Sequence, residues 1–147
     1  MVPQFDNTEK GTDKMTITFS NPDAVAAPVS NYSQVARVDL GAAILIFISG
    51  QGPVDVRGQT VGADDPARQA EQVFTNIGAI LEAHGATPHD VAKLTIFLTD
   101  IRHRPFVSEA RDRSLSGAAP TSTLVEVNHL AVSDWMIEVE AIAIVKP

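Results

Sequence analysis

The sequence predicts an α+β fold, in which two helices cover one face of a mixed sheet to form a two-layer sandwich. Six short segments have the apolar pattern of strands, and two longer segments have helical periodicity. Their order along the chain is β-β-β-α-β-α-β-β, and 147 residues are typical of a single domain. We assign residues 15–147 to that domain and the polar residues 1–14 to a flexible N-terminal lead.

Three strands are expected before the first helix. Residues 15–19 (MTITF) alternate apolar and polar side chains and precede a turn at residues 21–23 (NPD). Residues 32–38 (YSQVARV) are expected to form the second strand. Residues 44–49 (ILIFIS) are almost continuously apolar, which is typical of a strand covered on both faces, and residues 50–53 (GQGP) end this strand.

The first helix is expected to begin after Asp65 and to end before Gly85. The carboxylate of Asp65 can cap the helix, and Pro66 suits the first helical position. Gly85 suits the position after the last turn, where a left-handed backbone is common. One face of the helix carries Ala70, Val73, Phe74, Ile77, Ile80, Leu81 and His84 at helical spacing.

The second half of the chain is expected to contain three strands and one weaker helix. Residues 90–100 form the first strand, and residues 105–116 form the helix, which Gly117 can terminate. Residues 122–130 and 136–145 form the last two strands. One face of the strand at 90–100 is expected to carry Ala92, Leu94, Ile96 and Leu98, and the other Lys93, Thr95 and Phe97.

The central strand at 44–49 is apolar on both faces. One face carries three isoleucines, and the other carries Leu45 and Phe47. Two helices can cover only one face, so the other needs a further layer. We expect a second copy of the chain to cover it, because burying these side chains favours association. The alternative is a third layer built from the N-terminal strand.

Composition excludes several kinds of site and partner. The chain has no cysteine, which excludes disulfides, thiolate metal sites and a cysteine nucleophile. No two of the four histidines have the i, i+4 spacing of a helical metal site, so we expect no metal. A net charge of −7 disfavours nucleic acid and anionic membranes as partners. Because no apolar run is long enough to cross a bilayer, we expect a cytoplasmic protein.

Six motifs in register resemble those of the Rid family, also called the YjgF family and formerly the endoribonuclease L-PSP family. The resemblance covers about residues 20–146. The motifs are residues 32–34, 49–53, 69–77, 91–100, 120–127 and 137–143. The resemblance implies a chorismate-mutase-like fold that assembles as a homotrimer with ligand clefts between subunits. It also implies hydrolysis of reactive imines and enamines to ketones or ketoacids and ammonia, with no metal or organic cofactor.

Four residues of the family's site are present at matching positions. The active-site tyrosine falls on Tyr32, and a serine–glycine pair falls on Ser49 and Gly50. The glutamate that positions or activates water falls on Glu138. A carboxylate in a partly dry cleft can orient and deprotonate water. The resemblance therefore implies that Glu138 and Tyr32 are catalytic and that Ser49 and Gly50 contact the ligand.

The carboxylate-binding half of the family's site is altered. The arginine that grips a substrate carboxylate is replaced by Ser122, beside Thr121. The usual asparagine and a common tyrosine of the second helix fall on Ser108 and Arg111. A serine hydroxyl does not replace the two charge-assisted bonds of a guanidinium. Either the substrate is neutral or differently shaped, or another cation enters the cleft. The first candidate for that cation is Arg111, followed by Arg102 and Arg104.

Two functions from different classes remain after these observations. The first is an enzyme that hydrolyses an imine or enamine other than the usual 2-imino acid, with water positioned by Glu138. The alternative is a non-catalytic small-molecule binding or regulatory protein on the same scaffold. RNA cleavage, suggested by the family's older name, is disfavoured by the net charge of −7.

Overall fold

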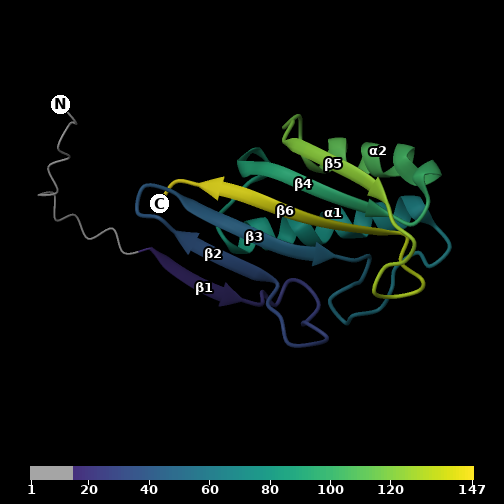
Figure 1. Cartoon of the computed structure of the whole chain (residues 1–147), viewed down its shortest axis with the longest axis horizontal. Coiled ribbons are helices and arrows are strands. Elements are labelled where there is room, and N and C mark those ends of the chain that lie inside the picture. The colour runs from purple at the N-terminus through teal and green to yellow at the C-terminus, as the bar shows by residue number, and fades with distance from the viewer. Residues whose placement is uncertain (1–14) are drawn as a thin grey trace, which may run out of the picture.

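Six strands form one sheet, and both helices lie on the same face of it (Figure 1). The computed structural model describes residues 15–147, so the N-terminal lead predicted for residues 1–14 lies outside the described residues. The predicted α+β class and the order of the elements are confirmed. The elements are β1 (Thr16–Ser20), β2 (Val35–Asp39), β3 (Ile44–Gln51), α1 (Pro66–Ala83), β4 (Val91–Leu98), α2 (Arg104–Ser114), β5 (Thr121–Glu126) and β6 (Ile137–Val145).

The sheet is mixed, with the spatial order β1-β2-β3-β6-β4-β5. β4 and β5 pair in parallel, and every other neighbouring pair is antiparallel. α2 therefore makes the crossover that a parallel pair requires. β1 pairs with β2 at one edge of the sheet. The alternative prediction of a third layer is therefore wrong, because the N-terminal strand extends the sheet instead of covering it.

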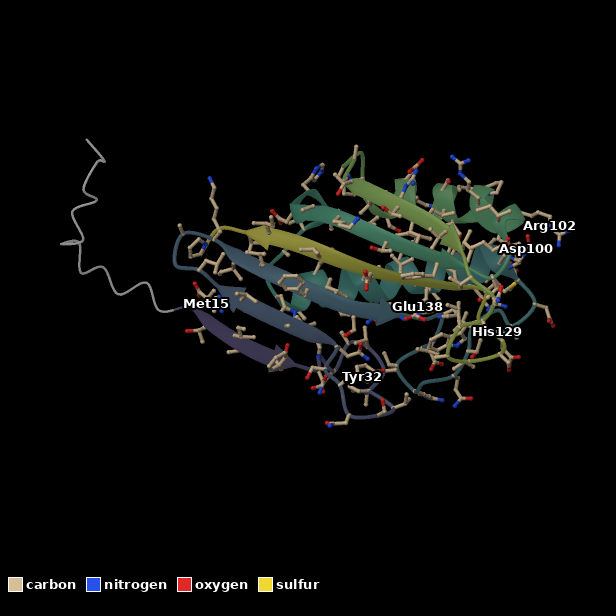
Figure 2. The ribbon with its side chains drawn as sticks, in the orientation of Figure 1. Met15, Tyr32, Asp100, Arg102, His129 and Glu138 are labelled. Atoms are coloured by element: carbon tan, nitrogen blue, oxygen red, sulfur yellow. The ribbon has the colours of Figure 1, made fainter. Side chains whose placement is uncertain are left out.

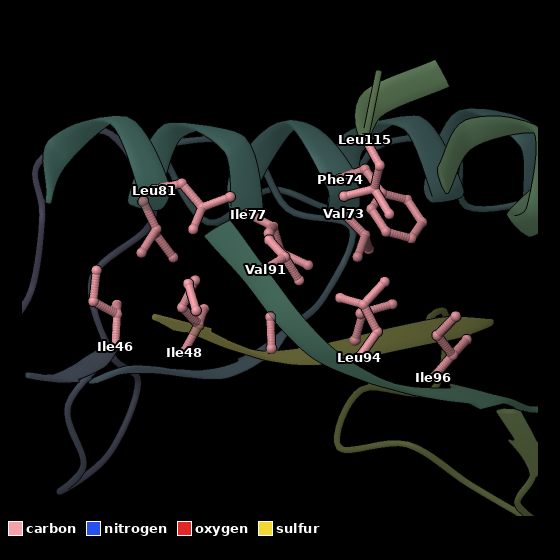
Figure 3. Close-up of a cluster of buried hydrophobic side chains, with 14 of the residues drawn as sticks. Ile46, Ile48, Val73, Phe74, Ile77, Leu81, Val91, Leu94, Ile96 and Leu115 are labelled. Carbon is pink, nitrogen blue, oxygen red and sulfur yellow. The ribbon is translucent and has the colours of Figure 1, made fainter. Parts of the chain in front are cut away.

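The core lies between α1 and the sheet, as Figure 3 shows. Ile77 and Leu81 of α1 face the sheet, where Ile46 and Ile48 of β3 are also buried. The predicted ends of α1 are confirmed. The Asp65 carboxylate accepts hydrogen bonds from the backbone N–H groups of Ala67 at 3.0 Å and Arg68 at 3.1 Å. Gly85 has a φ of 68°, which a side chain would disfavour.

Four predicted strands differ from the structure by two or more residues at one end. The strand predicted to run to residue 100 is β4, which ends at Leu98. β2 begins at Val35, so Tyr32 lies in a loop, where its N–H bonds the Ser30 carbonyl at 2.9 Å. This short-range turn removes Tyr32 from the ladder. β3 continues to Gln51 through an irregularity after Ile48. β5 ends at Glu126, so its predicted extension through His129 and Leu130 is wrong.

The predicted face of Ala92 is also wrong. The register of β4 against β6 shifts between Val91 and Lys93. A bulge takes an extra residue, so side chains on either side of it change their alternation. Val91 is therefore buried with Leu94, whereas Ala92 is only partly buried.

The sheet face away from the helices is open and apolar. Cross-strand pairing places Phe19, Phe47 and Ile142 in one row on this face. Phe19 is 68% exposed and Ile144 is 45% exposed. Contiguous exposed apolar side chains of this size usually mark an interaction surface. No helix in residues 15–147 has the length and hydrophobicity to cross a membrane.

We predict that Asp65→Ala lowers the free energy of unfolding by about 1 kcal/mol, because two N–H groups at the start of α1 lose their acceptor. Urea unfolding at fixed protein concentration measures this change. Asp64→Ala is the matched control, because Asp64 is exposed and does not cap the helix. Equal effects of both substitutions would contradict the capping role.

Candidate functional site

A pocket of about 500 Å³ lies where β3 and β6 meet three loops. Tyr32 and Glu138, two of the residues predicted from the sequence, both line it, and Figure 2 shows them in the same part of the molecule. Ser49 and Gly50 also line it. The structure therefore brings together all four residues that match the family's motifs, although their chemical roles stay predictions.

Glu138 extends from β6 over the backbone of β3. In the strand register Glu138 lies opposite Phe97 of β4, on the open face. Its chain neighbours Ile137 and Val139 are buried in the core. A Cβ placed on Gly50 would overlap the Glu138 carboxylate. Gly50 thus leaves the space that this carboxylate occupies. Within residues 15–147 the carboxylate has neither a hydrogen bond nor an ion pair, so it faces the pocket without a partner.

The environment of Glu138 favours its protonated form. Burial raises the pKa of this carboxyl above the ordinary glutamate value, because desolvation penalises the charge. The negative charge of Glu140, two residues along the same strand, raises the pKa further. A carboxylate with a raised pKa accepts a proton more readily, which suits a general base.

Buried glutamines hold the ends of β2 and β3 together. The Gln51 amide donates to Gln34 Oε1 at 2.8 Å and to the Ser49 carbonyl at 2.9 Å. The Gln34 amide donates to the Ala26 carbonyl at 2.9 Å. The Ser49 hydroxyl donates to the Ser33 carbonyl at 2.6 Å, so it serves the scaffold in this structure. These bonds fix the backbone beside Tyr32 and Gly50.

Two buried amides of α1 hold the other walls of the pocket. Gln69 donates to the Asp134 carbonyl at 2.7 Å and accepts from the Met136 N–H at 2.7 Å. Asn76 donates to the carbonyls of Gly52 at 3.2 Å and Val54 at 2.9 Å. Both amides belong to a motif that resembles the family's, although the sequence assigned them no role. Their positions on the apolar face of an amphipathic helix were a signal that they are buried and bonded.

Trp135 is a wall of the pocket that the sequence did not place in the site. Its ring lies against Gly52, where a Cβ would overlap three ring carbons. Its Nε1 is buried and has no hydrogen-bond partner in residues 15–147, so packing determines where the ring lies. Gly52 is therefore the sequence signal for this contact, in the same way that Gly50 is for Glu138.

The other four predicted ligand-binding residues do not line this pocket within one chain. Ser122 pairs with Leu94, whose side chain is in the core, so the register places Ser122 on the helix-covered face. The Thr121 hydroxyl donates to the Ala92 carbonyl at 2.8 Å. Ser108 and Arg111 lie on α2, where Arg111 forms an ion pair with Asp112 at 2.8 Å.

Arg102 and Arg104, the remaining candidate cations, do not line the pocket either. Arg102 is exposed, and its hydrogen bonds to Asp100 lower the pKa of that carboxyl to about 2. Figure 2 shows this pair at the edge of the molecule, away from Tyr32. No group of three or more potential metal ligands is found among residues 15–147.

Comparisons with known proteins identify related sequences and structures. The model of the family described as Endoribonuclease L-PSP matches residues 23–145. The 2-iminobutanoate/2-iminopropanoate deaminase of Salmonella typhimurium is 36% identical over 132 residues, which cover 88% of this chain and 96% of that protein. Protein DfrA of Myxococcus xanthus is 35% identical over 122 residues, which cover 83% of this chain and 91% of that protein.

Solved structures with the same fold include two bacterial relatives. RidA from an Antarctic Psychrobacter species has a TM-score of 0.77 and 32% identity, covering 87% of this chain and 99% of that chain. TdcF of E. coli with bound serine has a TM-score of 0.76 and 29% identity, covering 88% of this chain and 99% of that chain.

We predict that Glu138→Gln raises the free energy of unfolding above that of wild type, and that this gain grows as the pH rises. A carboxyl whose folded pKa is raised costs no stability below its unfolded pKa, and the full cost appears above its folded pKa. The difference in unfolding free energy should therefore grow as the pH rises above 4.5, the ordinary value, and then level off.

Urea unfolding across this pH range checks the prediction. Glu140→Gln is the matched control, since Glu140 lies two residues away and is exposed. Its effect should depend less on pH. A constant difference between Glu138→Gln and wild type at every pH would contradict the raised pKa.

Proposed function

The chain belongs to the endoribonuclease L-PSP family, which is the Rid family, and we propose that it hydrolyses an imine or enamine to a carbonyl compound and ammonia. The observation that carries this proposal is the unpartnered Glu138 carboxylate in a pocket shared with Tyr32. Relatives named 2-iminobutanoate/2-iminopropanoate deaminase support the reaction class. Water is the only co-reactant that the reaction needs.

In the proposed reaction Glu138 moves the protons. Its carboxylate takes a proton from water as the water oxygen bonds to the imine carbon, and the C=N electron pair moves to nitrogen. The carboxyl then returns that proton to the amine nitrogen. The hydroxyl of the intermediate then transfers its proton through the same carboxylate to the nitrogen, and the C–N bond breaks to release ammonia as the carbonyl forms. The Tyr32 hydroxyl is proposed to orient the substrate or the water at the pocket rim.

We also propose that the active protein is a homotrimer with its clefts between subunits. The open apolar sheet face supports association, since one chain leaves Phe19 and Phe47 exposed. A depression of about 570 Å³ on this face shares Tyr32 and Ser49 with the pocket. A neighbouring copy on this face would therefore enclose the site, and Thr121, Ser122, Ser108 and Arg111 are candidates to complete it from that copy.

The substrate is proposed to differ from the usual 2-imino acid. Ser122 stands where the family has an arginine, and no cationic side chain lines the pocket among the described residues. Charge-assisted bonds to a carboxylate are thus missing within one chain. The same observation favours the second candidate function, a non-catalytic small-molecule binding protein on this scaffold.

We predict that Glu138→Gln lowers turnover of a responsive imine by about a hundredfold or more, because the general base is lost. Imines are generated in situ, by an amino-acid oxidase for 2-imino acids and by an amine oxidase for imines without a carboxylate. The measured quantity is the acceleration of ammonia release over the spontaneous rate. Glu140→Gln, the matched carboxylate outside the pocket lining, should retain most of the activity.

The substitution Ser122→Arg tests whether the chain has a changed substrate specificity or has lost the deaminase activity. It should increase the rate on 2-imino acids if the scaffold retains the water-activating residues. Acceleration by wild type that survives in Glu138→Gln would contradict the proposed base. A wild-type protein and a Ser122→Arg variant that accelerate no imine would favour the binding protein.

We predict that Phe47→Asp dissociates the trimer, because a charge on the open face would be buried without a partner. Sedimentation should report three chains of 15.7 kDa for the wild type and one for the variant. Ile101→Asp is the control, because Ile101 is similarly exposed but lies outside the sheet, after the end of β4. A wild-type protein that sediments as a monomer would overturn the assembly.

A further inference from the structure

We propose that the pocket selects a cationic ligand with an apolar body, a protonated imine that carries no carboxylate. That the ligand is an imine rests on the function proposed above; that it is cationic rests on the observations below. They concern the charge in the pocket, the aromatic ring that lines the same pocket, and the polar groups that are still free to bond.

Glu138 is the charged side chain among the residues that line the pocket. Its carboxylate has no partner within residues 15–147, and a partly buried charge without a partner is costly. Glu140 is exposed and does not line the pocket, although its charge raises the Glu138 pKa. An anionic ligand would meet the Glu138 carboxylate, whereas a cation would neutralise it.

An aromatic ring lines the same pocket as this carboxylate. Glu138 occupies the space above Gly50, and Trp135 occupies the space above Gly52, two residues further along the chain. A tryptophan ring favours an organic cation in a pocket, because the ring quadrupole attracts positive charge.

The rest of the lining suits an apolar body. Alanine and valine side chains from all three loops line the pocket, including Ala26, Val54 and Val132. The amides of Gln34 and Gln51 and the hydroxyl of Ser49 already bond to protein groups. The hydroxyls of Ser30, Tyr32 and Thr60 also line the pocket, but the Glu138 carboxylate is the charged group among the described lining residues and therefore places the positive end of a ligand.

This charge preference matches the chemistry of the proposed reaction. A protonated imine carries its positive charge across the C=N bond that water attacks. Pairing with Glu138 would place the imine carbon next to the group that deprotonates the water. A carboxylate on the substrate would oppose this placement through repulsion from Glu138.

The test uses three ligands that do not react and share one ring: cyclohexylammonium, cyclohexanol and cyclohexanecarboxylate. Calorimetry with the full-length protein measures their dissociation constants. We expect cyclohexylammonium to bind about tenfold more tightly than cyclohexanol, and cyclohexanecarboxylate to bind more weakly than cyclohexanol. Added salt should weaken only the binding of the cation. Trp135 is the single tryptophan of the chain, so its fluorescence gives a second readout.

Two variants, with Glu140→Gln as their control, assign the preference to residues. Glu138→Gln should remove the advantage of cyclohexylammonium over cyclohexanol, while Glu140→Gln should retain most of it. Trp135→Leu should weaken binding of the cation more than binding of cyclohexanol. Equal or tighter binding of the carboxylate would overturn the proposal and would indicate that a neighbouring copy brings a cation such as Arg111 into the site.

The result of this binding experiment can be told apart from the result of the deaminase assay. Binding of cyclohexylammonium through Glu138, with no acceleration of any imine, would support the cation site and contradict the proposed reaction. Hydrolysis of 2-imino acids together with preferred binding of the carboxylate would support the reaction and overturn the cation site. Failure of all three ligands to bind would also overturn it.

Discussion

Two buried amides on α1 constrain the site more than any other interaction. Gln69 and Asn76 lie on the apolar face of the helix, where an unbonded amide would cost about 1–3 kcal/mol. Their partners are backbone groups of the loops at residues 52–54 and 134–136. Packing α1 onto the sheet therefore also positions two walls of the pocket. The helix that forms the core and the loops that form the site are thus held by the same contact.

The backbone irregularity of β3 has a similar double role. It lets the strand continue past Ile48 to Gln51, and it brings Gly50 beneath the Glu138 carboxylate. Because Gly50 has no side chain, a carboxylate can lie partly buried there without a partner. The resulting rise in the Glu138 pKa comes first from burial and second from Glu140. The chemistry proposed for this carboxylate depends on that local lack of solvent.

The family motifs predict Tyr32, Ser49, Gly50 and Glu138 as site residues, and the structure places all four in one pocket. The sequence pattern placed Tyr32 in a strand, because no glycine or proline in residues 32–38 marks the turn that removes it. It also placed Ala92 on the core face, because strict alternation does not include a bulge. Gly52 signals that another group packs closely on the backbone there, but the sequence does not show that this group is the ring of Trp135.

The sequence by itself determined the α+β class, the limits of α1, the apolar character of both faces of β3 and membership of the family. These properties depend on local periodicity, capping residues and motifs, which are written in neighbouring positions. Only the tertiary structure decided which side chains face the pocket, that Ser122 lies on the helix-covered face, and that Glu138 is partly buried in a pocket that Trp135 also lines. Contacts between distant segments set these properties, because register, bulges and burial arise only when strands and loops pack together.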